Sequence, residues 1–163
     1  MGDRTATLAP VGVEILTLRA SARGTWSYRR LVTLPRDGES PDAAARRACG
    51  VHADDPGTVV HSTSWRYLPE GQVVLTYAVC PDPEPHAPAE ELADLRPARG
   101  AAPARPAPAA PAVGQVAAHA VRHLAFLNVT DPVVREALAR TPEIVTALAG
   151  VSPSLAGEAG DLV

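Results

Sequence analysis

Lysine is absent from this 163-residue chain, whose 15 basic residues are all arginine. Aromatic residues are also scarce, at 4%, with one Phe, three Tyr and two Trp. Much of the 46% apolar fraction is alanine, which buries little area, so Val, Leu and Ile must fill the core. This composition resembles the coding bias of a high-GC bacterial genome. The arginine preference is therefore weak evidence for phosphate binding, although arginine suits that task.

Long hydrophobic runs are absent as well. No stretch approaches the roughly 18 apolar residues of a membrane span, and the first residues form no apolar signal core. The net charge is −3 and no segment is a basic tail, which argues against a nucleic-acid partner. We therefore expect a cytoplasmic protein without membrane or nucleic-acid partners. The only cysteines, Cys49 and Cys80, are far from any CxxC spacing and are expected to be reduced, buried thiols.

The first part of the chain predicts two strands. Val11–Leu18 is almost entirely apolar, which is typical of a central strand. Thr25–Leu34 alternates, with Trp26, Tyr28 and Arg30 on one face. A turn at Arg23-Gly24 would join the two strands.

A short helix is predicted next, in the stretch DGESPDAAARRACGV. Ser40 is a favourable N-cap, and Pro41 occupies the first helical position, where its missing N–H costs nothing. Ala43–Cys49 contains mostly good helix formers. Gly50 can adopt the left-handed conformation that ends a helix.

The next segment has the pattern of a β-hairpin. Gly57–Leu68 and Gln72–Cys80 are rich in β-branched residues, and Pro69–Gly71 supplies the turn. Strict alternation would put one set of side chains on a single face: Val59, His61, Thr63, Trp65 and Tyr67. We interpret Trp65 as a core aromatic residue and Arg66 as its exposed neighbour.

Proline and alanine then dominate residues 81–114, which hold nine of the 17 prolines. Such a segment buries too little apolar surface to offset its ordering entropy, so we predict a surface linker with a possible helical turn at Ala89–Leu95.

Helical periodicity returns at residue 115, and Thr130-Asp131-Pro132 and Thr141-Pro142 predict two further helix starts. The apolar stripe of the first of these helices consists of Val116, Ala120, Leu124 and Leu127.

These elements predict an α+β fold with helices on both faces of a mixed sheet. Residues 1–80 would supply the strands and the short helix. The linker would span residues 81–114, and residues 115–150 would complete the same domain. Residues 151–163 are predicted to be a disordered tail.

The short helix resembles part of the Nudix box, the magnesium-binding motif of nucleoside-diphosphate hydrolases. Gly38-Glu39-Ser40 is similar to the GES segment of that motif, and Arg47 stands at the matching distance after Glu39. Gly50-Val51 resembles its closing pair, four residues early. The resemblance implies a Nudix-like α/β/α sandwich and a salt bridge between Glu39 and Arg47 that braces the loop.

The acidic half of the motif is missing. Ala48 stands where the family has Glu, and the following Glu-Glu pair has no counterpart. Magnesium needs hard oxygen ligands, so we expect neither a metal nor another cofactor. The resemblance implies a non-catalytic Nudix-like domain that binds a nucleotide or other phosphorylated small molecule, or acts as a regulatory module. Two alternatives remain open: a divergent pyrophosphohydrolase using Glu14, Asp54 or Asp55, and a protein–protein adaptor that docks through the C-terminal helices.

Several side chains around the short helix are candidates for a ligand site. Arginine could bind a phosphate while an aromatic ring stacks on a base. The candidates are Arg29, Arg30, Arg36, Arg46, Trp26 and Tyr28; the alternative is an ordinary solvated face. His119 and His123 have a spacing that can bind zinc, but the sequence offers no evident third ligand besides His86 in the linker, so we interpret them as residues that flank the apolar stripe.

Overall fold

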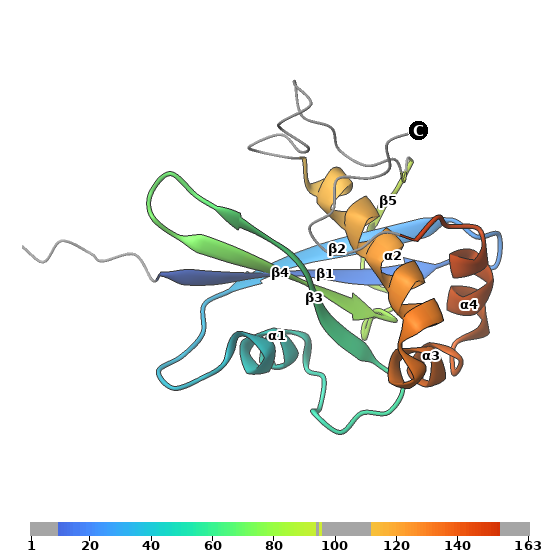
Figure 1. The fold of residues 1–163 in the computed structure, drawn as a ribbon, viewed down its shortest axis with the longest axis horizontal. Coiled ribbons are helices and arrows are strands. Elements are labelled where there is room, and N and C mark those ends of the chain that lie inside the picture. The colour runs from blue at the N-terminus through green and yellow to red at the C-terminus, as the bar shows by residue number, and fades with distance from the viewer. Residues whose placement is uncertain (1–9, 94, 96–111, 154–163) are drawn as a thin grey trace, which may run out of the picture.

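The structure is a computed structural model that describes residues 10–93, 95 and 112–153. A five-stranded mixed sheet lies at its centre, with the strand order β3-β4-β1-β2-β5 (Figure 1). The strands are β1 (Val11–Ala20), β2 (Trp26–Thr33), β3 (Val59–Tyr67), β4 (Val73–Cys80) and β5 (Glu90–Glu91). Strand β1 runs parallel to β4 and antiparallel to β2.

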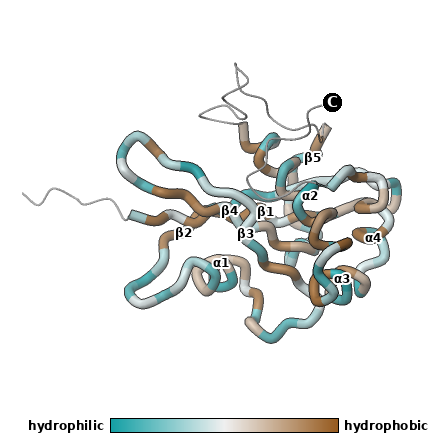
Figure 2. Tube along the Cα trace, viewed as in Figure 1, coloured by the Kyte–Doolittle hydropathy of each residue, from teal (hydrophilic) through white to brown (hydrophobic). Residues whose placement is uncertain are grey.

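Strand β1 is central, as its apolar sequence predicts. Every residue from Gly12 to Leu18 is buried, because neighbouring strands flank β1 and helices cover both faces of the sheet. Alternate side chains serve two separate cores. Val13 and Ile15 pack on one face, whereas Leu16 and Leu18 pack on the other. Figure 2 shows the central strands as largely hydrophobic.

Helices cover the two faces unequally, and the α+β class is confirmed. Helix α1 (Pro41–Cys49) packs on one face through Ala44 and Ala45. The other face carries the larger core, built with α2 (Val113–Thr130), α3 (Pro132–Leu138) and α4 (Pro142–Ala149) (Figure 1).

The predicted helix boundaries agree closely with the structure. Ser40 Oγ accepts a hydrogen bond from the backbone N–H of Ala43 at 3.1 Å, and Gly50 ends α1 with a φ of 68°. Asp131 caps α3 by accepting from the backbone N–H of Val133 at 2.9 Å. Thr141 stands at the N-cap of α4 without a side-chain capping bond.

The predicted facing of β3 is wrong beyond its middle. A bulge lies between Ser62 and Ser64 and adds one residue, so the alternation of side chains changes phase there. Trp65 is consequently 68% exposed and is no core residue. Arg66 points to the opposite face, where it bonds the buried Glu14.

Residues 81–93 are more ordered than a surface linker would be. Asp82 is buried, and Glu90–Glu91 forms the short strand β5 beside β2 instead of the predicted helical turn. The backbone N–H of Leu92 donates to the carbonyl of Trp26 at 2.8 Å, and Leu92 and Leu95 pack against the larger core. Our predictions for residues 96–111 and for most of the tail lie outside the described residues.

Among the residues that the structure describes, no helix combines the length and apolarity that a bilayer crossing requires. Cys80 is buried and Cys49 is partly buried, and both are free thiols. Burial raises the pKa of Cys49 to about 11, which leaves little reactive thiolate at neutral pH.

Candidate functional site

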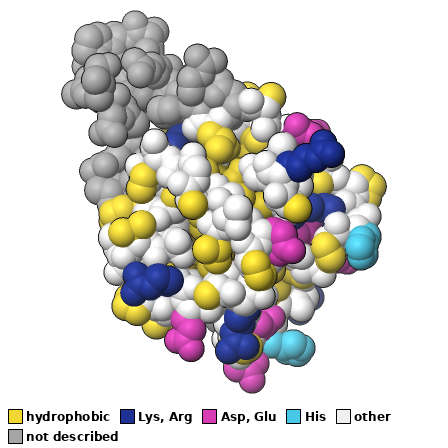
Figure 3. All heavy atoms as spheres, turned by 90° about the vertical axis from the view of Figure 1, so that its right-hand side faces the viewer, with side chains coloured by type: hydrophobic (Ala, Val, Ile, Leu, Met, Phe, Trp, Pro, Cys, Tyr) yellow, Lys and Arg dark blue, Asp and Glu magenta, His cyan; other side chains and the backbone are white. Residues whose placement is uncertain are grey.

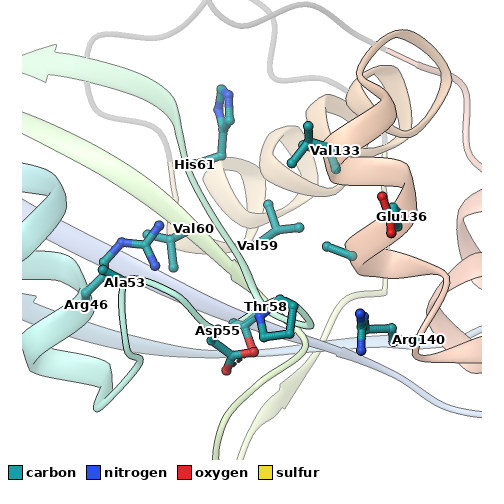
Figure 4. Close-up of a pocket in the computed structure, with 13 residues that line it drawn as sticks. Arg46, Ala53, Asp55, Thr58, Val59, Val60, His61, Val133, Glu136 and Arg140 are labelled. Atoms are coloured by element: carbon teal, nitrogen blue, oxygen red, sulfur yellow. Dashed lines mark hydrogen bonds between the residues drawn. The ribbon is translucent and has the colours of Figure 1, made fainter.

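A pocket of about 370 Å³ lies between β3, the loop of residues 52–58, and α3 (Figure 4). Its apolar wall consists of Val59 and Val60 from β3 with Val133, Val134 and Ala137 from α3. Its charged or titratable lining residues are Arg46, Asp55, His61, Glu136 and Arg140. The pocket therefore combines an apolar surface with groups that can recognise an anion.

The two arginines differ in how they are held. Arg46 lies across the pocket from Arg140 (Figure 4) and donates to Asp42 at 2.9 Å and to the carbonyl of His52 at 3.3 Å. Within the described residues, the guanidinium of Arg140 makes no hydrogen bond and no salt bridge, although its positive charge contributes to the lowered pKa of Asp55. Arg140 is thus the cation of this pocket that is best able to take an anionic ligand.

Asp55 belongs to the structure of the loop. Its carboxylate accepts from the backbone N–H of Gly57 at 2.9 Å and from the hydroxyl of Thr58 at 3.0 Å. The bond from Gly57, followed by that from Thr58, lowers the pKa of Asp55 and keeps it ionised. Asp55 therefore orders the segment that leads into β3 rather than offering a free carboxylate.

The structure does not bring the six predicted ligand residues together. Trp26 and Tyr28 are 2% and 7% exposed in the larger core, so neither ring can stack on a ligand at the surface. Arg29 and Arg30 are neighbours on β2 and point to opposite faces. Arg36 contributes its backbone N–H to Glu39, and Arg46 lines the pocket.

Arg29 bonds Asp82, a residue whose role the sequence did not reveal. The two guanidinium–carboxylate distances are 2.8 and 2.6 Å, and Arg19 lies 3.1 Å from the same carboxylate. Burial raises the pKa of Asp82, but the hydrogen bonds from Arg29 and the Glu84 backbone N–H, together with the charges of Arg29 and Arg19, outweigh burial, so the net pKa is lowered. This ion cluster fixes the chain after β4 against β1 and β2.

Arg30 belongs to a second cluster around Glu14, whose carboxylate is almost fully buried. Arg30 Nε donates to Glu14 at 2.7 Å, and Arg66 donates twice at 2.9 Å. The Thr76 hydroxyl adds a bond of 3.0 Å. Burial raises the pKa of Glu14, but the hydrogen bonds from Arg66, Arg30 and Thr76 bring it down to about 2.

The predicted contact between Glu39 and Arg47 is present. Arg47 Nε and Nη2 donate to the two carboxylate oxygens at 2.9 and 2.8 Å, and Nη2 also donates to the carbonyl of Leu34 at 3.1 Å. The bond from Arg47, followed by that from the Arg36 backbone, lowers the pKa of Glu39 to about 2. The pair ties the entry of α1 to its last turn.

The histidines on α2 meet β3. His119 Nε2 lies 3.2 Å from the carbonyl of Thr63, and the ring centroids of His123 and His61 are 5.4 Å apart. Burial, followed by the charge of Arg122, lowers the pKa of His119. No group of three or more His, Cys, Asp or Glu side chains in the described part of the chain is placed to hold a metal ion.

Comparison of the chain with protein-family models, with curated proteins and with solved structures finds no significant match.

Proposed function

We propose that this chain is a non-catalytic binding domain with a Nudix-like fold, and that a phosphorylated small molecule such as a nucleotide binds in the pocket between β3 and α3. One observation carries the proposal: Arg140 and Arg46 line the same pocket as an apolar wall, and within the described residues the Arg140 guanidinium forms no salt bridge or hydrogen bond, although its charge acts on Asp55. A phosphate would bind Arg140, and the rest of the ligand would contact the valines.

The dimensions and chemistry of the pocket support this ligand class. Its volume of about 370 Å³ lies within the roughly 300–1,000 Å³ that is usual for small-molecule sites. Arg46 and Arg140 line opposite sides of the pocket (Figure 4), so each offers a guanidinium group to an anionic part of a ligand. Val59 and Val133 offer apolar contact to a base or sugar ring.

The bidentate pair of Glu39 and Arg47 supports the Nudix-like part of the proposal. This pair keeps the loop before α1 in place, and α1 in turn carries Arg46 to the pocket. Ala48 stands where the Nudix box has a Glu, and the following Glu-Glu pair of that box has no counterpart in this chain. We therefore place the function in binding and assign no hydrolytic step.

Calorimetric titration and thermal shift with ADP, UMP and inorganic phosphate, each with and without EDTA, would test this function. We expect binding that survives EDTA and is lost in Arg140→Met. A ligand at 100 times its Kd should stabilise the fold by about 2.7 kcal/mol. Arg135→Met is the matched control, because Arg135 is an exposed arginine on α3 that bonds the carbonyl of Val129. Absence of binding, or equal binding by Arg140→Met, would refute the proposal.

A second candidate function is a protein-binding adaptor. Val129 and Val133 are 66% and 76% exposed near the junction of α2 and α3. Figure 3 shows hydrophobic side chains scattered among polar ones on the side of the molecule that includes α3 and α4. Isolated exposed valines are common on monomeric proteins, so this surface supports the adaptor less well than the pocket supports ligand binding.

A further inference from the structure

We propose a second binding site, formed by Arg30 and Arg66 on the sheet face that also carries α2, with Glu14 as the residue that positions both guanidinium groups. Its ligand is a carboxylate with a small apolar group. This site lies apart from the pocket at α3 and does not depend on the proposed function.

Strand register places the site across adjacent strands. Ser64 pairs with Thr76, and Thr76 pairs with Glu14, so the three side chains form a row on one face. Arg66 follows two residues after Ser64, and Arg30 reaches Glu14 from β2. Central strands that are covered on both faces usually carry apolar side chains, so this row of polar side chains is unexpected if the face only packs against a core.

Exposure shows that the outer sides of the two arginines are accessible. The side chain of Arg30 is 41% exposed and that of Arg66 is 25% exposed, whereas Glu14 beneath them is 1% exposed. Val32 follows Arg30 on the same face of β2 and is 59% exposed. A ligand could therefore reach both guanidinium groups and an apolar side chain from one side.

Charge and donor geometry define the ligand class. Two guanidinium groups face one carboxylate, so the cluster carries one excess positive charge, which a single carboxylate would neutralise. Arg30 donates one hydrogen bond to Glu14 and Arg66 donates two, which leaves further N–H groups on both side chains. The planar fork of arginine matches the planar carboxylate, and the exposed Val32 favours a ligand that has an apolar group.

Stability alone does not account for this arrangement. A buried ion cluster is frequently no more stable than well-packed apolar residues of similar volume. An apolar residue at position 14 would continue the pattern of β1, whose neighbouring residues Val13 and Ile15 are fully buried. Glu14 instead holds two arginines beside each other, which is the arrangement that a bidentate anion site needs.

Titration of the full-length protein with sodium benzoate, followed by NMR of the arginine Nε–Hε signals, would test the site. We expect saturable shifts of the Arg30 and Arg66 signals, and no such shifts with sodium chloride at equal ionic strength. Arg30→Gln should bind benzoate roughly tenfold more weakly. Arg23→Gln changes an exposed arginine of the β1–β2 turn and should bind normally, as should Arg140→Met.

Arg30→Lys is a second variant in case Arg30→Gln does not fold, since it keeps the charge and loses the fork; it should also bind more weakly. Absence of saturable shifts with benzoate would overturn the site. Tighter binding of inorganic phosphate than of benzoate would overturn the ligand class. Loss of benzoate binding in Arg140→Met would place the ligand in the other pocket and also overturn the proposal.

Discussion

Glu14→Gln should destabilise the protein strongly at neutral pH and much less in acid. The surroundings of Glu14 lower its pKa from the ordinary 4.5 to about 2, with the hydrogen bonds from Arg66 and Arg30 outweighing the opposing effect of burial. One pKa unit corresponds to about 1.4 kcal/mol, so the ionised carboxylate contributes about 3 kcal/mol to the free energy of unfolding. Glutamine removes this contribution and leaves two guanidinium groups beside a neutral amide.

The sign of the pH dependence follows from the lowered pKa. Stabilisation by a carboxylate whose folded pKa lies below its unfolded pKa is complete above the unfolded value, here 4.5. It is lost as the pH falls towards about 2, where the folded state also becomes protonated. The difference in unfolding free energy between the wild type and Glu14→Gln should therefore be largest at neutral pH and decrease through this interval.

Urea unfolding followed by circular dichroism at a series of pH values from neutral to acid would measure this difference. Glu70→Gln is a suitable control because Glu70 is exposed in the β3–β4 turn and makes no ion pair in the described structure. A difference that stays constant across the acid range would refute the electrostatic reasoning. Surface ion pairs typically contribute less than about 1 kcal/mol. A difference of that size at neutral pH would refute the inference that the buried Glu14 carboxylate stabilises the fold more than a surface pair does.

Three further predictions concern other parts of the fold. A double-mutant cycle of Glu39→Gln and Arg47→Met should give a clear favourable coupling at pH 7, since the two side chains form a bidentate pair; zero coupling would make the contact incidental. Trp65→Ser should leave the unfolding free energy almost unchanged, whereas Trp26→Ala should cost about 3–5 kcal/mol in urea unfolding, because only Trp26 is buried. The pKa of His119 is lowered in the folded state, so protonation of His119 favours the unfolded state. As the pH falls from 7 to 5, the unfolding free energy of His119→Gln should therefore decrease less than that of the wild type. Equal decreases in the two proteins would contradict this prediction.

Local signals in the sequence predicted the helix ends and the central strand well. Ser40, Pro41 and Gly50 act through their own backbone and nearest neighbours, so their roles do not depend on the rest of the fold. The apolar run of β1 likewise indicated burial on both faces. In each case the information lies within a few consecutive residues.

The ligand candidates could not be placed in the same way. Arg29 and Arg30 are adjacent in sequence, but side chains alternate along a strand and these two reach opposite faces. Their carboxylate partners, Asp82 and Glu14, lie 53 and 16 residues away. Clustering of arginines along the chain therefore does not indicate clustering in space, and the pocket residue Arg140 gave no local signal at all.

The bulge in β3 connects the failed prediction for Trp65 with the cluster around Glu14. Without the extra residue between Ser62 and Ser64, alternation would direct Trp65 towards the face of Glu14 and Arg66 towards the opposite face. Glu14 would then be buried with Arg30 as its only arginine partner. The same irregularity that leaves Trp65 exposed thus places the second guanidinium group on Glu14, which is why a strictly alternating interpretation of β3 missed both features.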